Sequence, residues 1–217
     1  IKLDGNYPTG TANVALGNAA LDSGSLSGDF NTAVGNAVLT NNTSGHRNVA
    51  IGYNALTTNT TGYCNNAIGQ GALNDNTTGI NNVAVGTCSL RINTTGGSNT
   101  AVGKDSLKAN TTGTDNVAVG ALALDANTSG TNIVAIGSGA LTANTTAINN
   151  VAVGFSALST NVTGSDNTAL GHQSLRDNTG ADNTGVGYRS LFANTSGTYN
   201  TALGWCSLST NATTNSN

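Results

Sequence analysis

The chain has 217 residues, of which only 8% are charged, and its formal net charge is −3. Ordinary globular domains carry about 25% charged residues, so this composition does not suit the surface of a typical soluble enzyme. Seven Lys and Arg residues cannot form a basic stripe for nucleic acid, and no apolar run reaches the roughly 18 residues of a membrane span. We therefore expect neither nucleic-acid binding nor membrane insertion.

Asparagine, threonine and glycine make up nearly half of the chain. Turn-forming residues on this scale indicate either disorder or a repeated turn. A hydrophobic content of 37% with a small net charge argues against disorder, which combines low hydrophobicity with high net charge. The sequence has no methionine and begins at Ile1, so we expect a piece of a longer protein.

Residues 1–12 come before any repeat, and we expect them to form an N-terminal segment that leads into the repeat region. From residue 13 the motif Asn-x-Ala-(Val/Ile/Leu)-Gly recurs, with glycine in place of alanine in one copy and isoleucine in place of asparagine in another. Successive final glycines are separated by 18, 16 or, most often, 17 residues. They are Gly17, Gly35, Gly52, Gly69, Gly86, Gly103, Gly120, Gly137, Gly154, Gly171, Gly187 and Gly204. The chain therefore contains twelve copies of a 17-residue unit.

Each unit is too short for the paired helices of helical repeats, and its glycine content opposes helix formation. Val49 and Ile51 share one face of an extended segment and Ala50 takes the other, as the period of two in a strand requires. We expect a second short strand around the following Ala-Leu pair, with turns joining the two. The sequence predicts an all-β fold, a parallel β-solenoid (β-roll) of about twelve coils. It spans residues 13–214, and residues 215–217 form a tail that continues into further sequence.

A leucine stands four residues after every repeat glycine and is expected to fill the core of each coil. The predicted core residues are Leu39, Leu56, Leu73, Leu90, Leu107, Leu124, Leu141 and Leu158.

Two columns of asparagine, one at the start of the unit and one in its turn, predict stacked side-chain ladders. In such a ladder each amide donates to one neighbouring coil and accepts from the other. The start column contains Asn31, Asn48, Asn65, Asn82, Asn99, Asn116, Asn150 and Asn167, and the turn column contains Asn42, Asn59, Asn76 and Asn93. Ile133 is expected to interrupt the first ladder, with Asn132 as a shifted replacement, and Gly24 to interrupt the second.

One isolated coil buries too few apolar side chains to offset the entropy of ordering seventeen residues. We expect the alanine face to pack against copies of itself, which makes the chain a homo-oligomer.

The position after the repeat glycine carries a ring in the last four units, at Phe155, His172, Tyr188 and Trp205. These residues are expected to stack into one stripe, with Arg189 and Phe192 nearby. Such a stripe suits docking of carbohydrate or protein. Packing between protomers, or against a domain that follows in the parent protein, is the alternative that we favour.

Candidates for catalysis are few. His46 and His172 are separated by seven units, and the acidic residues are scattered over variable positions. Cys64, Cys88 and Cys206 form no C-x-x-C pair, so free thiols are expected. We expect no catalytic residues, no metal site and no cofactor.

The segments Asn48-Val49-Ala50-Ile51-Gly52 and Asn150-Val151-Ala152-Val153-Gly154 resemble the repeat of YadA-like heads of trimeric autotransporter adhesins. The unit here is longer because it adds an Asn-Thr-Thr-Gly turn. The whole pattern, with the opening from Ile1 to Pro8, is more similar to tail-fibre proteins of phages that infect marine cyanobacteria. The resemblance covers residues 13–214 and implies a homotrimeric β-roll.

These observations predict a non-enzymatic shaft segment of a phage tail fibre, extracellular on the virion, that displays a host-receptor-binding tip. The expected partners are two further copies of the chain, other tail or baseplate proteins joined through sequence outside this segment, and host surface polysaccharide touched laterally. One alternative is the head or stalk of a bacterial surface adhesin. A weaker one is an ice-binding solenoid, because a column of threonines runs through Thr43, Thr60, Thr77, Thr94, Thr111, Thr128 and Thr145.

Overall fold

The computed structural model describes residues 11–217. The chain divides into two compact units, residues 1–112 and residues 113–217, and each is a parallel β-solenoid. Residues 1–10, which include most of the expected lead-in segment and the opening from Ile1 to Pro8, lie outside the described residues. Within the described part there are twelve strands and no helix, which confirms the all-β solenoid class.

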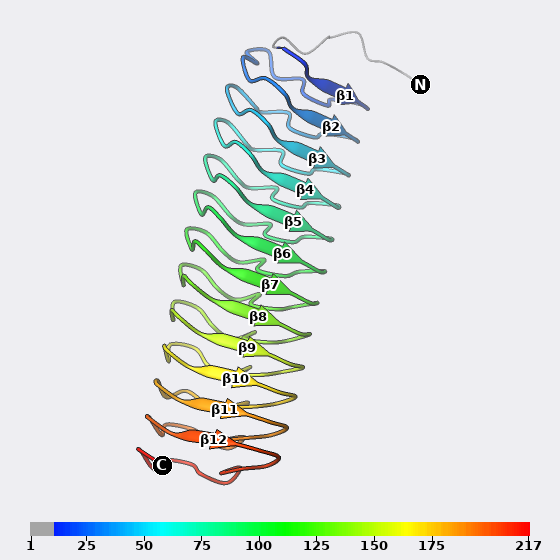
Figure 1. The fold of residues 1–217 in the computed structure, drawn as a ribbon. Coiled ribbons are helices and arrows are strands. Elements are labelled where there is room, and N and C mark those ends of the chain that lie inside the picture. The colour runs from blue at the N-terminus through cyan, green and yellow to red at the C-terminus, as the bar shows by residue number, and fades with distance from the viewer. Residues whose placement is uncertain (1–10) are drawn as a thin grey trace. The chain divides into compact units, whose positions relative to one another are not determined.

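Unit 1 contains six strands of three residues each, and every strand pairs in parallel with the next. The strands lie side by side, and a loop returns behind each one (Figure 1). They are β1 (Val14–Leu16), β2 (Thr32–Val34), β3 (Val49–Ile51), β4 (Asn66–Ile68), β5 (Val83–Val85) and β6 (Thr100–Val102).

Unit 2 repeats this arrangement with six further strands in the same parallel order. Equivalent residues of successive repeats face one another, for example Val151 and Thr168. The strands are β7 (Val117–Val119), β8 (Val134–Ile136), β9 (Val151–Val153), β10 (Thr168–Leu170), β11 (Thr184–Val186) and β12 (Thr201–Leu203).

The expected second strand around the Ala-Leu pair is wrong, because this segment is a series of turns. The leucine itself takes the left-handed conformation, with φ of 50° at Leu56 and 49° at Leu73. A non-glycine residue in this region costs roughly 1–2 kcal/mol, whereas full burial of a leucine contributes about 1.5–3 kcal/mol. The turn is therefore maintained by burial of the leucine rather than by local preference.

Backbone hydrogen bonds join successive coils outside the strands as well. In unit 1 the N–H of Leu56 donates to the carbonyl of Ala72 at 3.0 Å, and the N–H of Thr60 donates to that of Thr77 at 2.9 Å. These bonds place equivalent residues of neighbouring coils in contact around most of the circumference, which explains why the sequence repeats so strictly.

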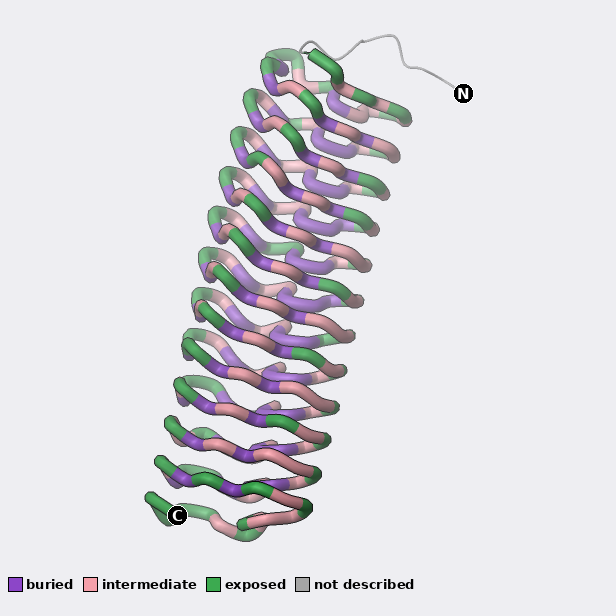
Figure 2. The backbone as a smooth tube through the Cα atoms, viewed as in Figure 1, coloured by how far each residue is buried: buried purple, intermediate pink, exposed green. Residues whose placement is uncertain are grey.

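The interior of each coil lies between the middle residue of the strand and the leucine turn. Ala50, Leu56 and Asn48 are all fully buried in the third repeat, and in β2–β12 the middle residue of the strand is buried between more exposed neighbours (Figure 2). The predicted core leucines, from Leu39 to Leu158, are likewise inaccessible to solvent. The leucine column therefore forms the core of both units.

The expectation that alanine packs against other copies of the chain is wrong, because the alanine face points into the coil. The glycine that replaces it in β11, Gly185, shows what lies opposite. A Cβ added there would meet the hydroxyls of Ser174 and Ser190 at 2.7 and 3.0 Å and the side chain of Leu175 at 3.2 Å. The cross-section is too narrow for a larger residue, so the strand position stays small.

Two kinds of glycine are required by the close approach of neighbouring coils. Gly52 has a φ of 139°, and a Cβ there would lie 2.6 Å from the carbonyl oxygen of Gly69. Gly62, in the turn, would place a Cβ 2.3 Å from the side-chain oxygen of Asn59. Real Cβ contacts are not this short, so the column of Gly52 is glycine in all twelve repeats, and a side chain in the column of Gly62 forces its neighbours to shift.

Candidate functional site: buried amide ladders and two exposed surfaces

The asparagines at the start of the unit form a continuous ladder in unit 1. The backbone N–H and the side-chain amide of Asn48 donate to the side-chain oxygen of Asn31 at 3.0 and 3.1 Å. Asn65 makes the same two bonds to Asn48, at 3.0 and 3.2 Å. Each side-chain oxygen thus satisfies a backbone N–H at the point where a strand begins, and these asparagines are fully buried.

The asparagines of the turn form a second ladder that meets the first. The amide of Asn59 donates to the side-chain oxygen of Asn42 at 2.8 Å and to the carbonyl of Gly62 at 3.0 Å. The amide of Asn48 donates to the same Gly62 carbonyl at 2.9 Å. The two predicted columns therefore converge on the turn glycine and satisfy buried backbone that has no sheet partner. The amides serve the fold and are inaccessible to a ligand.

Unit 2 contains both ladders, with one defect at Ile133. This side chain is fully buried, and its N–H still donates to the side-chain oxygen of Asn116 at 3.1 Å. The ladder resumes where Asn167 donates to Asn150 at 2.9 Å. The expected replacement, Asn132, is instead exposed and donates to Asn149 at 3.4 Å. Isoleucine therefore interrupts the ladder, as predicted, but nothing shifts to restore it.

A second defect in unit 2 was not expected. The side-chain oxygen of Asn144 is buried without a hydrogen-bond partner among the described residues, because the amide of Asn161 makes only the bond to the carbonyl of Gly164, at 2.7 Å, and not the one to the preceding ladder asparagine. Ala147 stands where other turns have glycine, and a Cβ at that position crowds the ladder amide. In unit 1 the turn ladder begins at Asn42, because Gly24 lies exposed.

The outward third residues of the strands form an exposed apolar row in each unit, and we name these residues of β1–β6 and of β7–β12 the aliphatic strand face. The first residue also points outwards, and it is Val in six strands and Thr or Asn in the other six. The third residue is Val, Ile or Leu in every strand. Ile51, Ile68 and Val102 in unit 1 are 36–40% exposed, and Leu170 in unit 2 is 46% exposed. Folding alone therefore leaves a row of aliphatic side chains in solvent, where a monomer rarely places them side by side.

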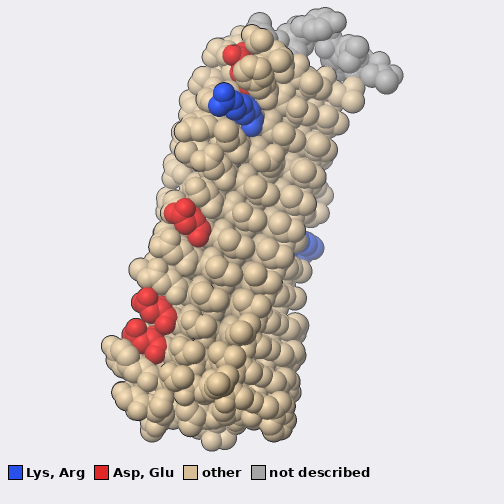
Figure 3. Space-filling model, in the orientation of Figure 1, with Lys and Arg blue, Asp and Glu red and all other residues tan. Residues whose placement is uncertain are grey.

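The aliphatic strand face carries no charge. None of the strands contains Lys, Arg, Asp or Glu, and in each unit the charged side chains visible in Figure 3 lie away from the strands. An apolar surface without charge is compatible with a second copy of itself, because no like charges would meet. This face, rather than the alanine face, is the surface that the fold leaves uncovered.

The four predicted stripe residues do stack in unit 2. We name Phe155, His172, Tyr188 and Trp205 the ring stripe. Their successive ring centroids are 5.3, 5.4 and 5.9 Å apart, with interplanar angles of 24°, 22° and 11°. All four side chains are exposed. The repeat therefore places one ring above the next at the corner that follows each strand.

Arg189 lies beside the ring stripe and Arg176 lies over the ring of Phe192, at 3.9 Å, and the two arginines differ in their partners. The Arg176 guanidinium makes a two-point ion pair with Asp177, both distances being 2.7 Å, and this hydrogen bonding raises the arginine's pKa. Arg189 lies over the rings of Tyr188 and Phe192, at 5.3 and 4.9 Å, and donates only to Gln173, at 2.8 Å. Among the described residues Arg189 has no ion pair, so its positive charge is uncompensated.

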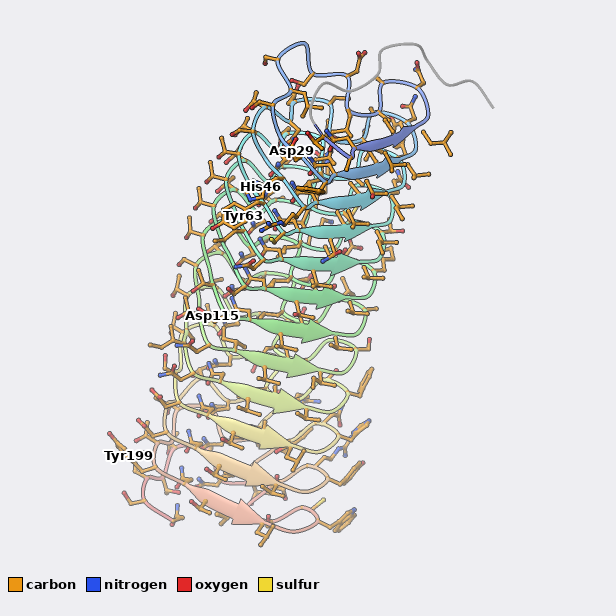
Figure 4. The ribbon with its side chains drawn as sticks, turned by 45° about the horizontal axis from the view of Figure 1, so that its top comes forward. Asp29, His46, Tyr63, Asp115 and Tyr199 are labelled. Carbon is orange, nitrogen blue, oxygen red and sulfur yellow. The ribbon has the colours of Figure 1, made fainter. Side chains whose placement is uncertain are left out.

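A further column was missed by sequence reasoning, at the position just before the start asparagine. Its residues take the left-handed conformation, which Asn and Asp tolerate better than most residues. In unit 1 this edge carries His46, whose ring stacks on Tyr63 at 4.8 Å, with Asp29 nearby (Figure 4). In unit 2 Asp115 and Tyr199 lie along the same edge of their own coils (Figure 4). The frequency of Asn and Asp at this position was the available signal.

In unit 1 a small pocket is lined by Asp29, His46 and Arg47. Within residues 11–217 no three His, Cys, Asp or Glu side chains are placed to hold a metal ion. Cys64, Cys88 and Cys206 are free thiols, as predicted. In this part of the chain there is also no helix with the length and apolarity to cross a membrane.

Comparison of the chain with family models, curated proteins and solved structures finds no match to any of them. The function must therefore be argued from the surfaces themselves.

Proposed function

We propose that this chain is a non-enzymatic shaft segment of a homotrimeric fibre, with the tail fibre of a phage as its setting. The observation that carries the proposal is the aliphatic strand face. Three copies that pack these faces together would remove the Val, Ile and Leu rows from water, at roughly 25 cal/mol per Å² of buried apolar surface. In this assembly the Val, Ile and Leu rows, rather than the alanines, form the contact between copies of the chain.

The proposed mechanism is mechanical. Each coil is joined to the next by strand pairing, by backbone bonds in the turns and by two buried asparagine ladders. Loss of any one contact leaves the others in place, as expected of a repeat protein whose stability resides in neighbour interactions. Such a segment would hold a receptor-binding tip away from the virion, and sequence outside it would supply attachment to tail or baseplate proteins.

A bacterial surface adhesin would use the same assembly. Its parent gene would encode a secretory signal upstream and a membrane anchor downstream, so the full-length sequence distinguishes the two settings.

The threonine column supports a structural role over ice binding. The hydroxyl of Thr43 donates to the carbonyl of Thr60 at 3.0 Å, and that of Thr77 donates to Thr94 at 3.0 Å. In unit 2 the hydroxyl of Thr128 donates to Thr145 at 3.1 Å. These hydroxyl protons are committed to neighbouring coils. An ice-binding face needs them directed at water, and a thermal-hysteresis assay is expected to show no activity.

The test of the proposal combines native mass spectrometry with one charged substitution. The chain mass is 21.4 kDa, so the trimer is expected at three times that value. Ile68→Lys places a charge in the middle of the face and is expected to abolish the trimer. Thr61→Lys adds the same charge at an exposed turn position of unit 1 and is expected to leave the trimer intact. A trimer that survives Ile68→Lys would refute the proposed interface.

A further inference from the structure

The two central rings of the ring stripe in unit 2 present mainly their edges to solvent. His172 lies between Phe155 and Tyr188, and Tyr188 lies between His172 and Trp205, so both faces of the two central rings are covered. Both central residues are nevertheless exposed, and their accessible surface is therefore the edge. An aromatic ring is negative on its face and positive at its edge. The stripe thus offers a line of weakly positive C–H, N–H and O–H groups.

This arrangement disfavours the neutral carbohydrate expected of an aromatic surface. Neutral sugars dock with their C–H faces against ring faces, and the stack covers both faces of His172 and Tyr188, so that only the outer faces of Phe155 and Trp205 lack a neighbouring ring. Groups that accept hydrogen bonds or carry negative charge are suited to ring edges instead.

Arg189 adds a full positive charge at the centre of this line. Its guanidinium lies against Tyr188 and Phe192, and Gln173 holds its Nε at 2.8 Å. The planar fork is thereby oriented by two rings and an amide, while no carboxylate among the described residues neutralises it. The neighbouring Arg176 is already occupied by Asp177, so Arg189 is the cation that remains for a ligand.

We propose that the ring stripe and Arg189 bind an acidic polysaccharide, with a uronic-acid carboxylate paired to the Arg189 guanidinium and the sugar chain running along the ring edges. The proposal rests on the lateral glycan contact of the proposed function and specifies its ligand class. Arginine pairs with carboxylates through two parallel hydrogen bonds.

Trp205 provides the readout, because it is the single tryptophan of the protein and belongs to the stripe. Titration of the full 217-residue chain with polygalacturonate at low salt is expected to change the Trp205 fluorescence saturably. Neutral dextran of similar length is expected to cause no change. Arg189→Gln removes the charge and is expected to weaken binding about tenfold or more, since a hydrogen bond to a charged group contributes about 1.5–3 kcal/mol.

Arg91→Gln is the matched control. Arg91 is an exposed arginine of unit 1, and its loss changes the net charge equally without touching the stripe. It is expected to leave the polygalacturonate affinity within twofold of the parent chain. Circular dichroism and native mass of both variants establish that fold and assembly are unchanged.

Two outcomes would overturn the proposal. One is the absence of a saturable fluorescence change with polygalacturonate, and the other is an equal loss of affinity in Arg189→Gln and Arg91→Gln, which would indicate general charge attraction. A monomeric mass with Arg189-dependent binding would refute the trimer and keep this site. A trimer that does not bind polygalacturonate would refute this site and keep the trimer, so the two proposals can be refuted independently.

Discussion

The start ladder makes a quantitative prediction at Asn65. Its side-chain oxygen accepts from the backbone N–H of Asn82 at 3.0 Å and from the Asn82 amide at 3.1 Å. Its amide donates to Asn48 at 3.2 Å and to the carbonyl of Gly79 at 2.9 Å. Asn65→Ala removes all four bonds.

The consequence differs for each former partner. The Asn82 amide keeps Gly96 at 2.9 Å, the Gly79 carbonyl keeps Asn76 at 3.1 Å, and the Asn48 oxygen keeps the backbone N–H of residue 65. Only the backbone N–H of Asn82 loses its sole acceptor. An unsatisfied buried donor costs about 1–3 kcal/mol, and the lost amide packing adds to this, so we expect a destabilisation of about 2–4 kcal/mol.

Urea unfolding followed by circular dichroism measures the effect. Asn41→Ala is the control, because Asn41 is exposed in a turn of the same unit, and its substitution is expected to change the unfolding free energy by less than about 0.5 kcal/mol. Equal unfolding free energies for the two variants would refute the structural role assigned to the ladder.

Four further predictions concern the leucine core, two positions of the turn and an ion pair. Leu124→Ala empties a fully buried site and is expected to cost about 2–5 kcal/mol, whereas Leu122→Ala, 44% exposed and also left-handed, should cost far less; similar urea midpoints would contradict the assigned core. Gly62→Ala should destabilise because its Cβ would meet the Asn59 side chain and the Gly79 backbone. Ala147→Gly should instead raise the unfolding free energy by about 1 kcal/mol, since satisfying the Asn144 oxygen outweighs the added chain entropy; a loss of stability would contradict the proposed crowding. Hydrogen bonding from Lys104, reinforced by Lys108, lowers the pKa of Asp105 from its ordinary 3.8, so this carboxylate contributes stability that is fully present above about pH 5 and is lost as the pH falls through its folded pKa. The unfolding free energy of the parent chain should therefore exceed that of Asp105→Asn by less below about pH 4 than at neutral pH. A difference that grows as the pH falls would contradict the lowered pKa of Asp105.

Much of the fold could be predicted because each residue of a repeat contacts the equivalent residue of the next coil, so the same residue types recur at the same positions. The strand at Val49–Ile51, the buried Leu56 and the ladder at Asn48 each follow from a residue type that recurs every 17 positions. The second strand could not be predicted correctly, because leucine in a left-handed turn contradicts its local preference. Only the tertiary contacts of the coil stabilise that conformation.

The sequence pattern also predicts the wrong side of the strand as the surface that contacts other copies. Alternation separates Ala50 from Val49 and Ile51, but it does not say which side is inside. Larger side chains are ordinarily buried, and here the narrow cross-section reverses this rule. The interior is filled by the leucine and the two amide columns, which leaves room only for alanine and directs the larger residues outwards.

The ring stripe was predictable as a stack, since one position of the repeat carries all four rings. Its chemistry was not predictable, because only the structure shows that both faces of the two central rings are covered and that Arg189, unlike Arg176, has no carboxylate partner among the described residues.

The central claim is that the aliphatic strand face joins three copies of the chain. Native mass spectrometry of the parent chain and of Ile68→Lys tests this claim most directly. The account predicts a trimer of three 21.4 kDa chains that Ile68→Lys converts into a folded monomer, with Thr61→Lys remaining trimeric. A parent chain that is already a clean monomer at 21.4 kDa would contradict it.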